Sequence, residues 1–206
     1  MTLAHPATGD PSQVIERLRS VRDVAAEFSD ALDREGYRLT VPGSVLRPTM
    51  GGSVIIGPAI TLRYLPVRRH TGNLTAEDPA GKLGNMRMLA YARAGSVMVV
   101  ESPSIEVSVL GSEAAAGLLG AGVVGAIVDG AVRDVAGLAA LQFPCWSRGR
   151  TPTTGRWRIE ATDFGSAVAI CGIQVQPGDM VVADDGGVAF VPADRFNELA
   201  GKLLPR

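Results

Sequence analysis

The 206-residue sequence has few of the side chains that build the commonest metal and nucleophile sites. It holds two cysteines, Cys145 and Cys171, in unrelated contexts, so neither a disulfide framework nor a cysteine-based zinc site is predicted. Both are interpreted as core thiols. The two histidines, His5 and His70, are too few for a histidine-centred triad. Any acid or base chemistry must therefore use other groups.

An excess of one charge and long apolar runs are also absent. The 20 basic and 21 acidic side chains leave a net charge of -1, which argues against a nucleic-acid partner. The apolar run over 121–128 is far shorter than the roughly 20 residues that span a bilayer, and the N-terminus lacks a signal-peptide pattern. We therefore expect a cytoplasmic protein with no membrane partner. The hydrophobic content of 46% is enough for one substantial core, so residues 1–206 are expected to form a single domain.

Hydrophobic spacing predicts alternating helices and strands. Residues 1–10 are expected to be a flexible tail, and 11–35 one helix that begins after Asp10 and ends at Gly36. The other expected elements are strands at 54–65 (interrupted by Gly57-Pro58), 96–101 and 123–128, helices at 85–93, 111–119 and 135–141, short strands at 167–175, 180–184 and 187–191, and a closing helix at 194–204. This order predicts an α/β fold with a parallel βαβα half, followed by a β-meander and a C-terminal helix.

Two segments are predicted to be loops. The polar segment 66–84, which contains His70, Asn73, Glu77 and Asp78, is long enough to be functional or mobile. The segment 148–163 has little apolar content and is expected to be a surface excursion.

The stretch 125–134 is the most informative part of the chain. It predicts a buried strand that ends at an Asp129-Gly130 turn and presents Arg133 and Asp134 side by side. A guanidinium and a carboxylate at a strand end can hold a hard cation beside an anionic oxygen, although a surface ion pair explains them as well. Asp129 is interpreted as a structural Asx-turn residue, with a supporting role near Arg133 left open.

Glycine and aspartate clusters elsewhere carry weaker signals. The segment 120–125 matches GxGxxG, but a helix precedes it and a strand follows, the reverse of a dinucleotide-binding turn. The Gly111-Ser112-Glu113-Ala114 turn opens a helix whose backbone N–H groups suit a small carboxylate, or Ser112 is an ordinary N-cap. Asp179, Asp184 and Asp185 lack EF-hand spacing and are interpreted as turn formers.

Five segments together carry a family resemblance. They are Gly57-Pro-Ala-Ile-Thr61, Gly111-Ser-Glu113, Val128-Asp-Gly-Ala-Val-Arg-Asp134, Phe143-Pro144 and Gln176-Pro-Gly-Asp-Met-Val-Val-Ala-Asp-Asp-Gly-Gly-Val188. Over roughly 54–192 the chain resembles the RraA-like family, which includes the class II 4-hydroxy-4-methyl-2-oxoglutarate / 4-carboxy-4-hydroxy-2-oxoadipate aldolases, once labelled demethylmenaquinone methyltransferases. The resemblance implies an α/β/β sandwich that assembles as a homotrimer or a pair of trimers, with active sites at subunit interfaces.

The resemblance also implies roles for particular residues. It implies that Asp134 ligates a divalent metal, Mg²⁺ or Mn²⁺, and that Arg133 is the catalytic residue that stabilises the pyruvate oxygen. The substrate, a small 2-oxo acid, is held by Gly111, Ser112, Glu113, Ala114 and Arg133. The implied activity is retro-aldol cleavage to pyruvate, oxaloacetate decarboxylation, or both.

Two positions depart from the aldolase signature, which is Gly, twenty residues, Arg-Asp, two residues, then an acidic residue. The glycine position falls on Ser112 and the acidic position on Gly137. A missing carboxylate weakens the hold on a cation or its water. The alternative function is therefore a non-catalytic regulator that acts by protein contact, for example on a ribonuclease, as the family's name-giving member does.

Overall fold

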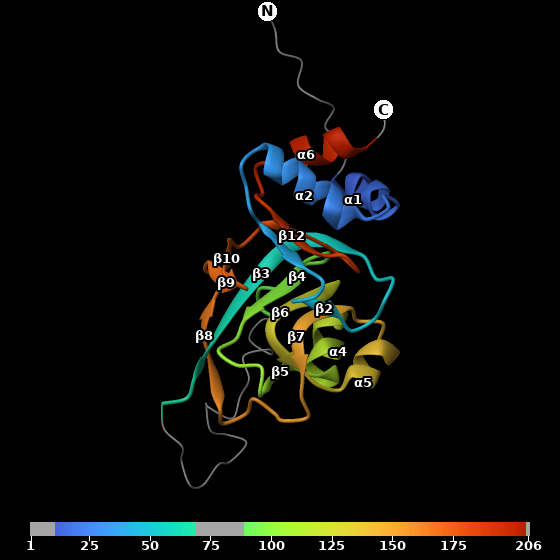
Figure 1. The fold of residues 1–206 in the computed structure, drawn as a ribbon. Helices are drawn as coiled ribbons and strands as arrows, with labels where there is room; N and C mark the ends of the chain where they lie inside the picture. Colours follow the sequence, from blue (N-terminus) through green and yellow to red (C-terminus); the bar gives the residue numbers. More distant parts are fainter. Residues whose placement is uncertain (1–10, 69–88, 205–206) are drawn as a thin grey trace, which may run out of the picture.

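A computed structural model describes residues 11–68 and 89–204 (Figure 1). The helices are α1 (Pro11–Arg19), α2 (Val24–Arg34), α4 (Ser112–Gly120), α5 (Val135–Ala140) and α6 (Phe196–Leu203). The strands are β1 (Thr40–Pro42), β2 (Arg47–Pro48), β3 (Ile55–Pro66), β4 (Val97–Glu101), β5 (Ser108–Leu110), β6 (Gly125–Val132), β7 (Cys145–Arg150), β8 (Ile159–Phe164), β9 (Val168–Ile170), β10 (Ile173–Val175), β11 (Met180–Asp184) and β12 (Gly187–Val191).

One large mixed sheet organises these elements. Its 10 strands follow the order β1-β12-β11-β3-β4-β6-β7-β2, with β5 added beside β6 and β8 beside β3. The pairs β3–β4, β4–β6 and β6–β7 are parallel, whereas β11 and β12 pair antiparallel with each other. The predicted α/β class, with a parallel half and a β-meander, is confirmed. Because β4 and β6 are parallel neighbours, their carboxyl ends meet at one edge of the sheet.

Strand β3 belongs to both halves of this sheet. Its first residues pair antiparallel with β11, where Ile55 lies opposite Ala183, and its later residues pair parallel with β4, where Ala59 lies opposite Val97. The expected interruption at Gly57-Pro58 does not occur. Instead, Gly57 brings the strand against a neighbouring turn, since a Cβ there would meet the Gly95 carbonyl oxygen.

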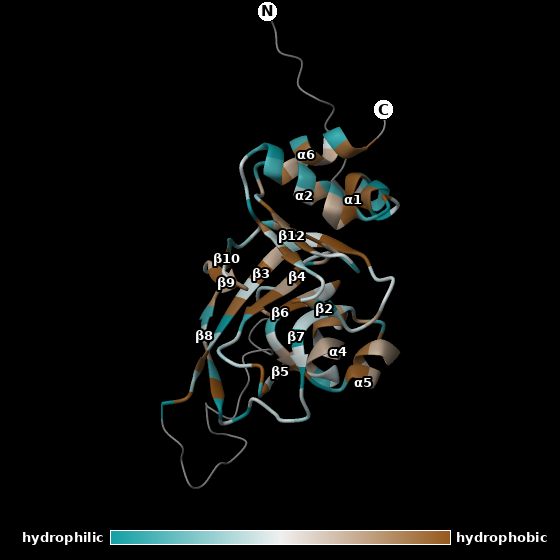
Figure 2. Ribbon diagram, in the orientation of Figure 1, coloured by the Kyte–Doolittle hydropathy of each residue, from teal (hydrophilic) through white to brown (hydrophobic). Residues whose placement is uncertain are grey.

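Helices α1, α2 and α6 cover the antiparallel half (Figure 1). Phe28 of α2 stacks on Phe196 of α6 with ring centroids 5.7 Å apart, and both helices bury their apolar side on β11 and β12. Figure 2 shows both apolar and polar residues along these helices, as expected for amphipathic helices at a surface. The single helix expected over 11–35 is wrong: Asp23 adopts a left-handed backbone conformation (φ 52°, ψ 43°) that separates α1 from α2. The expected end at Gly36 is confirmed, with φ +81°.

A second pair of helices packs on the parallel half. Leu118 of α4 and Leu138 of α5 are fully buried in one core with residues of β4, β5 and β6. On another side of the sheet, the β9–β10 hairpin packs Val168, Ile170 and Val175 into a core that contains Trp146. Helices α4 and α5 therefore complete one core, and the β9–β10 hairpin completes the other.

Two further expectations about the second half of the chain are wrong. The strand expected over 167–175 is a hairpin, because Cys171 (φ 50°) and Gly172 (φ 85°) both take left-handed conformations and reverse the chain. The expected excursion at 148–163 contains the end of β7 and most of β8, which pairs antiparallel with β3. The polar side chains of β8 misled the composition argument, since this strand is only partly buried.

Several expectations fall on residues outside the described ranges. These are the tail 1–10, with its cap at Asp10, most of the 66–84 loop, with His70, and residues 85–88 of the helix expected over 85–93. The rest of that expected helix, 89–93, is described and is wrong, because these residues form turn and irregular backbone. In the ranges 11–68 and 89–204, no helix has both the length and the apolar character needed to cross a bilayer.

Candidate active site

Strand β6 is longer than the sequence predicted, and the predicted charged residues Arg133 and Asp134 follow its end. It runs without interruption from Gly125 to Val132, so the turn expected at Asp129-Gly130 is wrong. Gly130 serves close packing instead, because a Cβ there would lie 2.6 Å from the Ser102 Cβ. Arg133 and Asp134 follow at the carboxyl end of the strand, where the Arg133 N–H donates to the Leu110 carbonyl oxygen at 2.9 Å. This bond joins the ends of β5 and β6.

Arg133 and Asp134 form an open pair. The Arg133 Nε lies 3.5 Å from Asp134 Oδ2, and the two side chains are 35% and 40% exposed. Asp134 is the N-cap residue of α5 and has a left-handed backbone (φ 55°, ψ 41°), so the chain turns away from the direction of the strand at this residue. The Ser112 N–H (3.2 Å) and Ser112 Oγ–H (3.3 Å) both donate to the same Oδ2. Within the described residues, no hydrogen bond or ion pair reaches the other oxygen, Oδ1.

Gly111 makes this arrangement possible. A Cβ at this position would lie 2.6 Å from Asp134 Oδ2 and 2.9 Å from Arg133 Nε. Only a residue without a side chain lets the carboxylate and the guanidinium lie across the start of α4. Gly111 is therefore part of the site through the room it leaves.

The first turn of α4 supplies backbone donors beside this pair. Gly111, with an extended backbone, is the N-cap residue, so the alternative of Ser112 as an ordinary N-cap is wrong. The Ser112 N–H donates to Asp134, whereas the N–H groups of Glu113 and Ala114 have no intrahelical acceptor because the helical bonds begin with Ala115 N–H to the Gly111 carbonyl. The structure thus brings together all of the sequence-predicted site residues: Gly111, Ser112, Glu113, Ala114, Arg133 and Asp134.

Sequence reasoning missed a second charged region on the same strands. Asp129 is not an Asx-turn residue; it accepts from Arg148 Nη1 (3.0 Å) and from the Cys171 N–H (2.6 Å). On the next strand, Glu101 lies opposite Asp129 and accepts from Arg63 Nε (2.9 Å). The sequence signal that could have located this region is the pair of carboxylates, Glu101 and Asp129, at equivalent positions of two strands that are neighbours in the sheet.

The thiols fit the structural role predicted for them. Cys145 is fully buried, and burial raises the pKa of its thiol. Burial, and then the nearby negative charge of Asp129, raise the pKa of the Cys171 thiol to about 11. Both thiols are therefore protonated at neutral pH and are poor nucleophiles.

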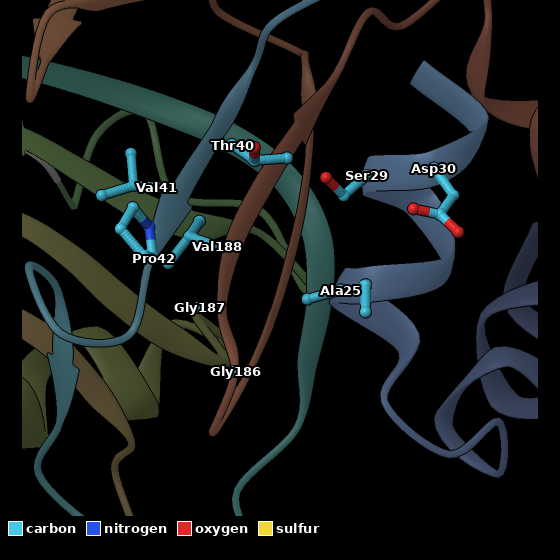
Figure 3. Close-up of a pocket in the computed structure, with 10 residues that line it drawn as sticks. Ala25, Ser29, Asp30, Thr40, Val41, Pro42, Gly186, Gly187 and Val188 are labelled. Carbon is cyan, nitrogen blue, oxygen red and sulfur yellow. The ribbon is translucent and has the colours of Figure 1, made fainter. Parts of the chain in front are cut away.

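Two pockets of the structure lie away from the open pair. One, of about 290 Å³, is lined by Ser29 and Asp30 of α2, Thr40 of β1 and the turn at Gly186 (Figure 3). Another, of about 700 Å³, lies between the end of α2 and the Cys171 hairpin. Neither is lined by Arg133 or Asp134. The Arg133 and Asp134 side chains are instead partly exposed at the surface of the chain.

The donor set around Asp134 suits only one kind of cation. Among residues 11–68 and 89–204, there is no group of three or more His, Cys, Asp or Glu side chains that could enclose a metal. A single carboxylate with an uncommitted oxygen fits a hard cation such as Mg²⁺, which keeps several waters and takes one or two protein carboxylates. It does not fit a dehydrated transition-metal centre.

The element order around the GxGxxG match is confirmed. Helix α4 ends at Gly120, Gly122 takes φ +83°, and β6 begins at Gly125. A helix thus precedes these glycines and a strand follows them, which is the reverse of the order in a dinucleotide-binding turn.

Comparisons with known proteins agree with this architecture. The chain is 30% identical over 184 residues to protein DlpA of Legionella pneumophila, a match that covers 87% of this chain but only 28% of that protein. It is 26% identical over 171 residues to a putative 4-hydroxy-4-methyl-2-oxoglutarate aldolase of Halalkalibacterium halodurans, covering 80% of this chain and 70% of that one.

Solved structures share the fold as well. The crystal structure of Streptomyces coelicolor RraAS2, described as an unusual member of the RNase ES inhibitor RraA protein family, is 27% identical with a TM-score of 0.76 and covers 96% of this chain and 93% of that chain. The family model for RraA-like proteins (Aldolase/RraA) matches residues 25–190. This range contains the Arg133–Asp134 site and all of the large sheet except Val191, the last residue of β12, and the chain belongs to the RraA-like family.

Proposed function

We propose that this chain is a lyase that cleaves a small 2-oxo acid to pyruvate with a divalent cation, Mg²⁺ or Mn²⁺, held by Asp134. The observation that carries the proposal is the open Arg133–Asp134 pair beside the free first-turn N–H groups of α4. The similarity to a putative 4-hydroxy-4-methyl-2-oxoglutarate aldolase supports the reaction class.

Each group has a separate task in this proposal. The Glu113 and Ala114 N–H groups bind the substrate carboxylate at the positive end of α4. Arg133 donates to the 2-oxo oxygen, and a cation held by Asp134 would supply a second positive charge to the site. When the carbon–carbon bond breaks, its electron pair moves into the pyruvate fragment and leaves an enolate. Arg133 interacts more strongly with this enolate oxygen than with the neutral carbonyl, which lowers the barrier.

Proton transfer is assigned to solvent water. In the retro-aldol reaction the 4-hydroxyl loses a proton as the bond breaks, and the enolate later gains one at its carbon. No histidine lies within residues 11–68 and 89–204 to carry it. Oxaloacetate gives the same enolate when it loses carbon dioxide, so both reactions are expected from one site.

We further propose that the active assembly is a homotrimer or a pair of trimers. The open surface around Asp134 supports this, because a site that must exclude water needs another wall. Light scattering coupled to gel filtration is expected to give three or six times the chain mass of 21.4 kDa. A monomer that is fully active would contradict the assembly.

The activity test measures pyruvate release with a coupled lactate dehydrogenase assay. Oxaloacetate and 4-hydroxy-4-methyl-2-oxoglutarate are each supplied with Mg²⁺ or Mn²⁺, and a reaction without protein corrects for spontaneous decarboxylation. Arg133→Lys keeps the charge but not the two-pronged donor, and Asp134→Asn keeps the shape but not the charge. We expect each to lower kcat/KM at least about 100-fold while circular dichroism stays unchanged. An Asp134→Asn protein as active as the native one would refute the role of Asp134 as the metal ligand, and a folded native protein that releases no pyruvate would refute the lyase.

A second candidate is a non-catalytic regulator that binds another protein. Gly137 favours it, because the acidic residue of the aldolase signature is missing there. The similarity to RraAS2, described within an RNase ES inhibitor family, supports it as well. Two results together would favour the regulator. Calorimetry would show no heat of binding for Mg²⁺ or Mn²⁺, and the protein would capture one identified ribonuclease in stoichiometric amount.

A further inference from the structure

Gly137 and Ser112 compete for one volume. Gly137 is the third residue of α5 and faces the first residue of α4. A Cβ added at Gly137 would lie 2.7 Å from the Ser112 Cβ and 3.1 Å from its Oγ. Non-bonded carbon atoms approach to about 3.5–4.0 Å, and a Cβ cannot rotate away because it is fixed to the backbone. Two helix starts would have to separate before both positions could carry side chains.

We propose that positions 112 and 137 are mutually exclusive, so that only one of them can carry a side chain, and that Ser112 uses the shared volume to position Asp134. The Ser112 N–H and Oγ–H both donate to Asp134 Oδ2. Two donors on one oxygen fix the carboxylate and direct ligands to the other oxygen. Ser112 is thus a positioning residue. Only this positioning role rests on the proposed function, because the steric exclusion holds for a protein of any function.

This pairing determines how many carboxylates the site can hold. With Ser112 present, the position at 137 has no side chain, and α5 adds no second carboxylate beside Asp134. A Cβ at 137 would lie 3.7 Å from the Asp134 Cβ, so an acidic side chain there would stand beside Asp134. Two adjacent carboxylates repel each other, and a shared divalent cation relieves that repulsion. Exchanging the two residues would therefore convert a weak cation site into a stronger one.

A stability cycle tests the exclusion without any assay of activity. Gly137→Ala alone is expected to lower Tm by about 3–10 °C through overpacking. In the Ser112→Gly background the same change is expected to raise Tm by about 2–4 °C, because alanine is the better helix former. Ser112→Ala removes the hydroxyl but keeps the Cβ, so Ser112→Ala with Gly137→Ala must still lose stability. The same sign of effect in the native and Ser112→Gly backgrounds would overturn the exclusion.

A cation titration tests the consequence for the site. Calorimetry with MnCl₂ alone compares the native protein, Ser112→Gly and the double variant Ser112→Gly/Gly137→Asp. We expect the double variant to bind Mn²⁺ at least about tenfold more tightly than either of the others. An affinity no higher than that of Ser112→Gly would overturn the assignment of this volume to the cation site. If the native protein releases no pyruvate but the Tm cycle changes sign as described, the lyase proposal fails and the exclusion stands.

Discussion

Two arginine–aspartate pairs have their aspartates on β6 and just beyond its end, and they differ in which carboxylate oxygens are left without a hydrogen bond or ion pair. Asp129 is 12% exposed; one oxygen accepts from Arg148 and the other from the Cys171 N–H. Asp134 is 40% exposed, and its contacts within the described residues all go to one oxygen. The same residue types thus form a closed pair and an open pair five positions apart. A carboxylate can serve a ligand only where the protein leaves an oxygen unoccupied.

The closed pair belongs to a fastening for the β9–β10 hairpin. Glu101, the neighbour of Asp129 on β4, accepts from the Ala169 N–H at 2.8 Å, so both carboxylates hold backbone groups of the hairpin. Arg63 reaches the same segment through the Ala167 carbonyl oxygen at 2.8 Å. These charged side chains all hold one segment against the sheet, and we assign them no catalytic or ligand-binding role.

The largest expected difference between the two pairs is in stability. Asp129→Ala leaves the part-buried Cys171 N–H without its acceptor and Arg148 without its partner, and it is expected to lower the free energy of unfolding by about 2–4 kcal/mol. Asp134→Ala removes an exposed pair and is expected to cost less than about 1 kcal/mol. Urea denaturation of both variants measures this, and equal losses would erase the distinction between closed and open.

Filling the space at Gly111 is expected to damage only the open pair. Gly111→Ala puts a Cβ where Asp134 Oδ2 and Arg133 Nε now lie, and both side chains can move outward into solvent. We expect Mn²⁺ affinity to fall about tenfold while the free energy of unfolding changes by less than about 1 kcal/mol. The control is Gly120→Ala in the same helix, where an added Cβ meets nothing within 4 Å. Unchanged Mn²⁺ binding in Gly111→Ala would separate Gly111 from the site.

Alkylation of Cys171 reports on the closed pair alone. Its thiol pKa of about 11 comes first from burial and then from the charge of Asp129, whereas Arg148 lowers it. Asp129→Asn removes that negative charge, so the pKa falls and the rate with iodoacetamide at pH 8 is expected to rise about threefold to tenfold. Arg148→Met is expected to slow the reaction, and Asp134→Asn to leave it unchanged. A faster rate in Asp134→Asn would show that the two pairs are coupled.

The smallest effect concerns a carboxylate outside both pairs. The Arg195 hydrogen bond, and then Lys202, lower the pKa of Glu35 from its ordinary value of 4.5. A lowered folded-state pKa contributes stability above the ordinary pKa, and this is lost as pH falls through the folded-state value. Thermal unfolding between pH 6 and pH 3 should therefore show a smaller acid loss in Glu35→Gln than in the native protein. Identical acid losses would mean that the network adds nothing.

The sequence predicted the elements whose pattern is local. Helix α4 and strands β11 and β12 lie within a residue or so of their expected positions, because their apolar runs are bounded by glycine and aspartate turns. It did not predict the break at Asp23 or the reversal at Cys171, since both residues take a left-handed conformation that is uncommon for any residue other than glycine. Strand β8 was missed because its stability comes from pairing with β3, a partner nearly 100 residues away.

The candidate site divides in the same way. The neighbours Arg133 and Asp134, and the turn at Gly111, are visible in the chain as a charged strand end and a helix start. The link between them depends on contacts across the fold: the hydrogen bonds from Ser112 to Asp134 Oδ2, and the volume shared by Ser112 and Gly137. In the sequence, Ser112 and Gly137 are two separate departures from the aldolase signature. In the structure they occupy one shared volume, so the two departures are linked.

Strand β3 makes the two halves of the molecule inseparable. Its 12 residues hydrogen-bond to β11 on one stretch and to β4 and β8 on another. A cut between Pro58 and Ala59 would deprive both halves of a strand at once, so complementary fragments produced by such a cut are expected to remain unfolded together as well as apart. The chain must therefore melt as one cooperative unit, and new segments can be fitted around it far more easily than into its middle.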